Sequence, residues 1–238
     1  MNPTLVLATL RQRFTSPIRL VILLLLGWLP MLQILLAPRA GFAALGHSHF
    51  LTLVLAAGMI GQDLSSGTLQ LLLARPVTRA QYVFSRWAAV AVGSFLVVVL
   101  QALCAAAIMF ARGAPAPWGQ AALYLGDSLL DAAGMAAVMA LLSSLSSGIA
   151  DLGLLFLAWL SAEVLEKVGM FKSWDWLTRG AGELLGTLKP ELDLTPLVQG
   201  GPFPWPAVVG YLSTVTLCLA LAVVVMNRRE LSYASSGS

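Results

Sequence analysis

From Val83 to Phe110 the chain reads VFSRWAAVAVGSFLVVVLQALCAAAIMF, a stretch of 28 residues with one charged side chain, that of Arg86. A helix needs about 20 mostly apolar residues to cross the hydrocarbon core of a bilayer, which is about 30 Å thick. This stretch exceeds that length and contains no proline. It therefore predicts a transmembrane helix.

Composition extends this prediction to the rest of the chain. Of its 238 residues, 58% are hydrophobic and 11% are charged, whereas soluble domains carry about 25% charged residues. Most of the surface is therefore expected to face lipid. The formal net charge of +3 does not indicate a nucleic-acid partner. The two cysteines lie inside apolar runs and suggest neither a disulfide framework nor a metal site.

Five further apolar segments flank the first one on both sides. The first of them begins after a basic stretch, but the run from Leu20 to Ala37 is longer than the apolar region of a signal peptide, which has about 7–15 residues. We therefore expect an all-α membrane protein, a single transmembrane domain over residues 1–238 with six membrane-spanning helices. The expected spans are residues 18–37, 50–62, 83–110, 121–145, 149–170 and 206–226.

The basic residues predict the orientation of these spans. With six spans both termini lie on one side, which collects most of the arginines, while the other side has nearly balanced charges. Because basic residues accumulate in cytoplasmic loops, we expect a multi-pass protein of the cell inner membrane with both termini in the cytoplasm. The arginines on that side are Arg11, Arg13, Arg19, Arg75, Arg79, Arg86, Arg228 and Arg229.

Two segments outside the spans have their own patterns. Leu7, Leu10 and Phe14 recur at helical spacing, which predicts an interfacial helix over about 3–16, with a plain cytoplasmic tail as the alternative. The stretch 171–205 is too polar to span and is rich in tryptophan and proline. There we expect an amphipathic helix near 175–188, followed by an irregular or re-entrant stretch over the outer mouth.

The most informative segment joins the second and third spans and reads GQDLSSGTLQLLLARPVTR from Gly61 to Arg79. It predicts a short amphipathic helix over about 63–76, because leucines fall on one face and polar residues on the other. Pro76 ends this helix, and Thr78 can cap the next one. Such a helix can dock into a groove on a soluble partner. The two faces are formed by Leu69, Leu72 and Leu73 and by Asp63, Gly67 and Gln70.

This segment resembles the linker of the ABC-2-type permease family, whose members commonly carry an acidic residue, Gly-Thr-Leu, a leucine run and Pro-Val-(Ser/Thr)-Arg. Aspartate stands where the family more often has glutamate, and Arg86 stands where lysine is frequent. The six-span layout also fits, although only the linker is specific. The matching positions are Asp63, Gly67, Thr68, Leu69, Leu72, Leu73, Pro76, Val77, Thr78 and Arg79.

The resemblance implies that these residues form a coupling helix against the ATP-binding subunit of a transporter, and that two permease copies pair, as a homodimer or a heterodimer. It also implies that the transporter works mostly in export. No G-x-x-x-x-G-K-[ST] phosphate-binding sequence occurs in the chain, so ATP and Mg²⁺ are expected in the partner subunit, with no cofactor and no catalytic residue here. The alternative for the segment is an interfacial helix without a partner.

Asp127 and Asp131 are candidates for the translocation path. They lie four residues apart in the fourth expected span, and a carboxylate in lipid is costly, so both are expected to face protein or water. The alternative is structural pairing near the surface with Arg112 or Lys167. His47 and His49 in the first outer loop lack a third ligand in the sequence, and no metal site is expected.

Two other functional classes are alternatives for this sequence. An intramembrane enzyme needs a buried nucleophile beside a base, but both histidines fall in a loop and no Gly-x-Ser-x-Gly motif occurs. A proton-driven secondary transporter could use Asp127 and Asp131, but the chain is short for that class and shows no inverted repeat. The sequence leaves the transported substrate open.

Overall fold

The computed structural model describes residues 2–46, 48–69, 77–114, 117–195 and 201–229, and within these ranges the chain is helical with short connections. The N-terminal part contains α1 (Pro3–Phe14), α2 (Pro17–Leu36), a 3₁₀ segment η1 (Pro38–Leu45), α3 (His49–Ala56) and α4 (Gly61–Ser65). The remainder contains α6 (Arg79–Ala111), α7 (Trp118–Leu145), α8 (Ala150–Lys172), α9 (Asp175–Leu188) and α11 (Trp205–Arg228).

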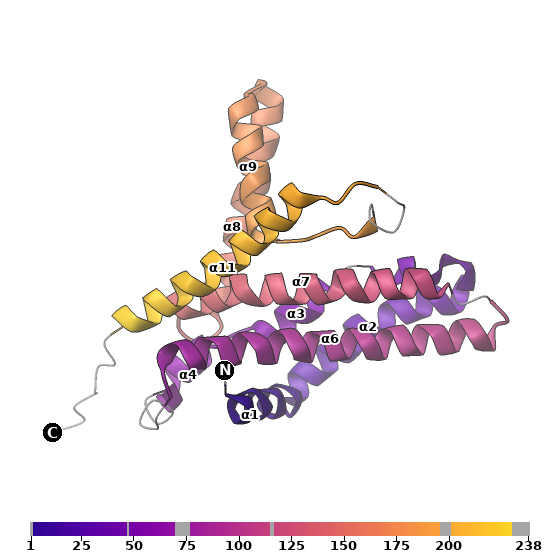
Figure 1. Cartoon of the computed structure of the whole chain (residues 1–238), viewed down its shortest axis with the longest axis horizontal. Coiled ribbons are helices and arrows are strands. Elements are labelled where there is room, and N and C mark those ends of the chain that lie inside the picture. The colour runs from indigo at the N-terminus through magenta and orange to yellow at the C-terminus, as the bar shows by residue number, and fades with distance from the viewer. Residues whose placement is uncertain (1, 47, 70–76, 115–116, 196–200, 230–238) are drawn as a thin grey trace.

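The helices form a bundle with one projection. Helices α6 and α7 run side by side along its long axis, and α11 crosses them obliquely near one end (Figure 1). Helix α3 packs on both of them, and α2 packs on α6 and α3. In contrast, α8 and α9 pack mainly on each other and stand out from the bundle (Figure 1). The expected all-α architecture is therefore confirmed for the described part of the chain.

Within that part, five helical stretches are long and apolar enough to cross a membrane by length and composition. They identify the chain as a multi-pass membrane protein. Each overlaps an expected span, namely the first, second, third, fourth and sixth. The five stretches are Pro17–Leu36, Gly41–Ser65, Arg79–Ala111, Trp118–Leu145 and Trp205–Arg228.

The span expected at 149–170 is helical but is not one of these five. Its residues form α8, a 23-residue helix whose second half carries Glu163, Glu166 and Lys167. Charged side chains are costly in the hydrocarbon core, which is why length alone does not qualify α8 as a span. Glu163 and Lys167 pair at 3.6 Å, as their spacing of four residues predicts. A sixth span therefore stays a prediction.

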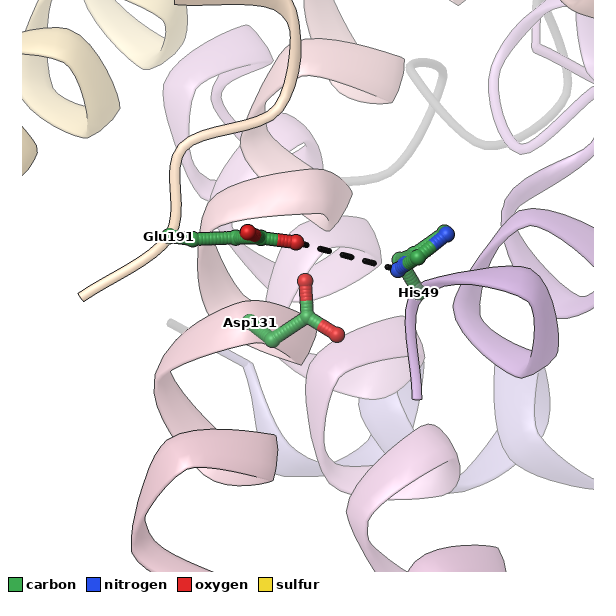
Figure 2. A group of neighbouring side chains, drawn as sticks. All are labelled: His49, Asp131 and Glu191. Carbon is green, nitrogen blue, oxygen red and sulfur yellow. Dashed lines mark ion pairs between the residues drawn. The ribbon is translucent and has the colours of Figure 1, made fainter. Parts of the chain in front are cut away.

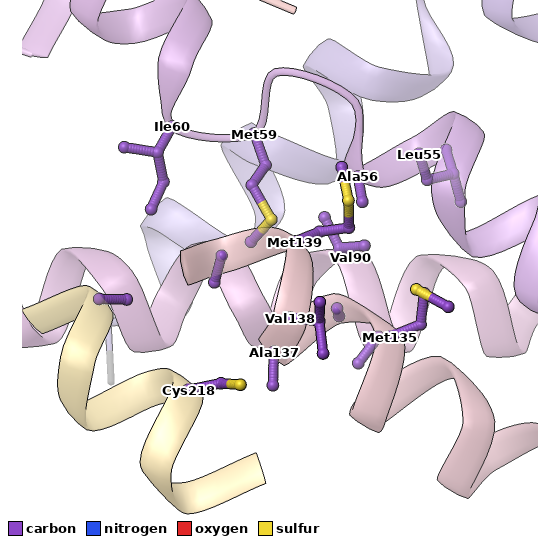
Figure 3. Close-up of a cluster of buried hydrophobic side chains, with 14 of the residues drawn as sticks. Leu55, Ala56, Met59, Ile60, Val90, Met135, Ala137, Val138, Met139 and Cys218 are labelled. Atoms are coloured by element: carbon purple, nitrogen blue, oxygen red, sulfur yellow. The ribbon is translucent and has the colours of Figure 1, made fainter. Parts of the chain in front are cut away.

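The core of the bundle is built around the small residues of α7. Ala136, Ala137 and Ala140 are completely buried, so neighbouring helices approach α7 closely. Met59 and Met139 fill the space between α7 and the end of α3, and Cys218 of α11 lies beside Ala137 (Figure 3). Helices of the same chain therefore pack closely along this stripe.

Local secondary structure agrees with several predictions, while the interfacial position expected for the N-terminal helix stays a prediction. The expected N-terminal helix over 3–16 is α1, and the helix expected at 175–188 coincides with α9. Thr78 caps α6 in a reciprocal capping box, in which its hydroxyl accepts from the Gln81 N–H while the Gln81 side chain accepts from the Thr78 N–H. After α9, residues 189–194 are irregular, as expected for that stretch.

Two predicted helices are wrong in their continuity. The second expected span, 50–62, is broken between α3 and α4, where Gly58 has a φ of +64°. The helix expected over 63–76 is interrupted after α4, which ends at Ser65, because Gly67 has a φ of +70°; Thr68 and Leu69 are helical again, and 70–76 lie outside the described residues. Neither angle fits a right-handed helix. Asp63 lies inside α4.

Candidate functional site

Polar groups gather at the two ends of the bundle, and the first gathering surrounds the break between α3 and α4. The carbonyls of Ala57 and Gly58 accept hydrogen bonds from the two terminal nitrogens of Arg13, at 2.6 and 3.0 Å. Arg19 donates to the Ala57 carbonyl at 3.2 Å and to the Gln62 side chain at 3.0 Å. The carbonyls freed by the break thus have partners on α1 and α2.

The amide groups of the same break have partners on the opposite side. The Gly58 N–H donates to Asp151 Oδ2 at 2.7 Å, and the N–H groups of Ile60 and Gly61 donate to Ser143 Oγ at 3.0 and 2.9 Å. The Gly148 N–H donates to the Gly61 carbonyl at 2.8 Å. A Cβ on Gly61 would lie 2.5 Å from the Gly148 carbonyl oxygen, so only glycine allows this approach.

Asp63 lies inside this end of the bundle. Its carboxylate forms an ion pair with Arg86 and accepts from the Tyr82 hydroxyl at 2.5 Å. Arg86 also donates to the side chains of Thr9 and Gln12, at 3.1 and 3.2 Å. Asp63 is only 3% exposed, so its polar side chain faces the interior of the bundle. It joins α4 to α6 and, through Arg86, to α1.

Arg13 shows how crowded with positive charge this end is. Burial lowers the pKa of its guanidinium, and the nearby Arg19 and Arg86 lower it further. Asp63 opposes that shift. Buried ions of like sign are tolerated only where carboxylates and carbonyls compensate them. Asp63 compensates Arg86, and the carbonyls of the break compensate Arg13.

The other predicted coupling residues lie in different surroundings. Thr68 is exposed and Gly67 is half-buried, whereas Leu69 is buried in the core. Arg79, at the start of α6, donates to the carbonyls of the C-terminal end of α11, at 2.5 Å to Met226, 2.8 Å to Asn227 and 3.1 Å to Arg229. The remaining three, Leu72, Leu73 and Pro76, lie outside the described residues.

The second gathering of polar groups lines a pocket of about 550 Å³ at the opposite end of the bundle. Its walls come from η1, the start of α3, the first half of α7 and the irregular stretch after α9. Four carboxylates belong to this lining, which makes the pocket acidic. The polar residues of the wall are Ser48, Gln120, Tyr124, Asp127, Ser128, Asp131, Glu191, Asp193 and Thr195.

The structure brings Asp127 and Asp131 to this pocket, but with partners other than those considered from the sequence. Asp131 Oδ2 accepts from the Ser48 hydroxyl at 2.6 Å, and Asp127 Oδ1 accepts from the Leu194 N–H at 3.0 Å. Pairing with Lys167 is wrong, because Lys167 contacts Glu163. The prediction that both carboxylates face protein or a water-accessible space is confirmed.

The sequence did not indicate that Asp131 and Glu191 lie beside His49. The ligand atoms of His49, Asp131 and Glu191 lie within 4.8 Å of one another (Figure 2). His49 Nδ1 and Glu191 Oε1 are 3.8 Å apart, and Glu191 Oε1 also pairs with Lys189 Nζ at 2.6 Å. Glu191 is more than 140 positions from His49 in the chain, and no spacing pattern links them. These three residues are the described ones that could hold a metal ion.

A comparison with known protein families connects these features to transport. Residues 30–160 match the family described as ABC-2 family transporter protein. The match covers more than half of the 238 residues and includes the break, Asp63, Arg86, Asp127 and Asp131. No curated protein matches the chain. The chain therefore belongs to the ABC-2 family of transporter proteins.

Proposed function

We propose that this chain is the transmembrane permease subunit of an ATP-binding-cassette exporter, and that a separate ATP-binding subunit docks on the segment between α4 and α6. ATP and Mg²⁺ would then bind in that partner. Two permease copies would pair in the cell inner membrane, each with both termini in the cytoplasm. Membership of the ABC-2 family supports this role.

The observation that carries the proposal is the way in which both ends of the α4–α6 segment are tied to the bundle. Asp63 joins the first end to α6 and α1, and the adjacent break contacts α7 and α8. Arg79 joins the second end to the terminus of α11. A displacement of the segment by a partner would therefore act on these helices together, since packed and hydrogen-bonded elements move as units.

The places where the segment 151–194 begins and ends support six crossings, whereas α8 and α9 themselves stand out from the bundle. Asp151 contacts Gly58 at one end of the bundle, whereas Leu194 contacts Asp127 at the other. Along α7 these ends are roughly 25 Å apart, from the helical rise of about 1.5 Å per residue. The chain therefore passes from one end to the other between 151 and 194, as a further crossing requires. An even number of crossings puts both termini on one side.

Co-purification tests the proposal directly. The tagged protein, extracted gently from its native membrane, is expected to retain an ATPase subunit near one-to-one stoichiometry, measured by quantitative mass spectrometry. Recovery of the protein alone, even after cross-linking, would contradict the proposal. Transport that then depended on a proton gradient would favour a secondary transporter that uses Asp127 and Asp131.

Cross-linking tests the docking position. Thr68 is exposed on the segment, and Ser173 is exposed at the turn between α8 and α9. A single cysteine at Thr68, in a chain whose Cys104 and Cys218 are replaced, is expected to cross-link to the co-purified ATPase. A single cysteine at Ser173 is the matched control and is expected not to. Equal cross-linking from both positions would contradict the proposed docking position, but it would not contradict the partnership with an ATPase.

A further inference from the structure

His49, Asp131 and Glu191 converge beside the pocket of about 550 Å³, far from the segment proposed to bind the ATPase. We propose that these three side chains bind a divalent transition-metal ion, with Zn²⁺ as the best match. The three residues come from the start of α3, the middle of α7 and the stretch between α9 and α11, and their side chains point toward one another (Figure 2).

The ligand set selects the class of metal. An imidazole nitrogen with two carboxylate oxygens suits Zn²⁺ and its first-row neighbours, whereas Mg²⁺ and Ca²⁺ prefer oxygen ligands throughout. Three protein ligands leave a fourth tetrahedral position for water or another ligand. Asp127 and Asp193 line the same pocket, and their charge raises the local concentration of cations.

Each of the three ligands is held by its own surroundings. Asp131 is oriented by the Ser48 hydroxyl at 2.6 Å, an arrangement typical of second partners around metal ligands. His49 is the first residue of α3 and is largely buried. The stretch that carries Glu191 lies close against α7, because a Cβ on Gly134 would come within 2.7 Å of the Pro190 carbonyl oxygen.

A bound ion requires a small closure. Ligand atoms about 2.0–2.1 Å from a tetrahedral zinc are about 3.3 Å from one another, whereas the present separations reach 3.8 Å for His49 and Glu191 and stay within 4.8 Å overall. Glu191 is the ligand free to adjust, since its side chain is 38% exposed and lies on an irregular stretch. Its ion pair with Lys189 at 2.6 Å competes with the metal.

The consequence is a cross-link at the mouth of the pocket. A metal bound to all three residues would join the stretch after α9 to α3 and α7 and would stabilise the closed arrangement, because an ion that binds the folded protein raises its stability. Without the ion, the same stretch is held to α7 through Asp127 and Leu194.

Metal titration of the purified protein tests the site. The protein carries an affinity tag without histidine, is treated with EDTA, and is titrated with Zn²⁺ by isothermal titration calorimetry in detergent. One ion per chain is expected, together with a higher melting temperature. His49→Ala and Glu191→Gln are each expected to weaken binding at least about tenfold, and Ser48→Ala about tenfold. Lys189→Ala is expected to strengthen it, because the competing ammonium is removed.

His47→Ala is the matched control, since it removes the other histidine of the chain, and it is expected to leave binding unchanged. Glu191→Gln preserves the shape of a partly exposed side chain, so its folding is not at risk. The proposal is overturned if the original protein does not bind one Zn²⁺ per chain, or if His47→Ala weakens binding as much as His49→Ala.

Discussion

The two ends of the bundle use buried polar groups in opposite ways. At the end that holds the α3–α4 break, Arg13, Arg86, Asp63 and Asp151 contact one another or the backbone, and the contacts join α1, α4, α6 and α8. At the other end, Asp127 and Asp131 surround a pocket of about 550 Å³ together with Glu191 and Asp193.

This difference has a physical meaning. A buried charge with a partner in contact is costly to separate, because removing the partner leaves an uncompensated ion in a medium of low dielectric constant. Carboxylates around an accessible pocket keep contact with water or a cation and can rearrange at lower cost. We therefore expect the first end to move as one body and the second to adapt to what it binds.

The largest expected effect comes from breaking the Asp63–Arg86 ion pair. Asp63→Leu alone, or Arg86→Met alone, is expected to lower the free energy of unfolding by about 3–5 kcal/mol, because each leaves a buried charge without its counterion. The measurement is unfolding in mixed micelles titrated with SDS. Asp63 also accepts from Tyr82, and Arg86 also donates to Thr9 and Gln12, so the two single variants are expected to be similarly damaging.

The double variant sharpens this result. With both residues replaced by apolar side chains no buried charge remains, so the double variant is expected to be more stable than either single variant. Losses that simply add would show that the two residues act independently. The contrast between the ends of the bundle would then lose its main support.

A smaller effect is expected from Ser143, whose hydroxyl accepts from two N–H groups of the break. Ser143→Ala leaves both amides buried without this acceptor and is expected to cost about 1–3 kcal/mol. Ser144 is equally buried, but its hydroxyl donates to the Leu141 carbonyl within α7. Ser144→Ala is therefore the matched control, with a loss below about 1 kcal/mol expected in the same SDS titration.

Features that depend on local sequence patterns could be predicted, whereas features that depend on contacts between distant residues could not. Apolar runs and a tryptophan-flanked amphipathic pattern are local, and the helices at 79–111 and 175–188 agree with them. The breaks at Gly58 and Gly67 escaped prediction, because an isolated glycine permits a positive φ without requiring it. Gly58 adopts one where Arg13 and Asp151 supply the partners of a broken helix, and those residues are far apart in the sequence.

The candidate sites show the same limit. The positions of Asp127 and Asp131 predicted that they share a face and avoid lipid, but not that Ser48 and Leu194 would be their partners. His49 was noticed as a histidine in a loop, and its relation to Glu191 depends on how the stretch after α9 packs on Gly134. Ser143 lies in a serine-rich helix end, and its contact with the break depends on the packing of α7 beside Gly61.

The smallest expected effect belongs to the pocket that Asp127 and Asp131 line, and it depends on pH. Hydrogen bonds from the side chain and the N–H of Thr195 hold the pKa of Asp193 below its usual value of 3.8. The lowered pKa means that the charged carboxylate stabilises the folded turn above pH 3.8, and that this contribution is lost as the pH falls through the folded-state pKa. Asp193 is exposed, so solvent screens the contribution to at most a few tenths of a kcal/mol.

Asp193→Ala should therefore melt slightly below the original protein at pH 6, and the two melting temperatures should converge as the pH is lowered below about 3.8. A difference that grew on acidification would mean that Asp193 is held in its protonated form, and the pocket would then resemble the tightly paired end that holds the α3–α4 break.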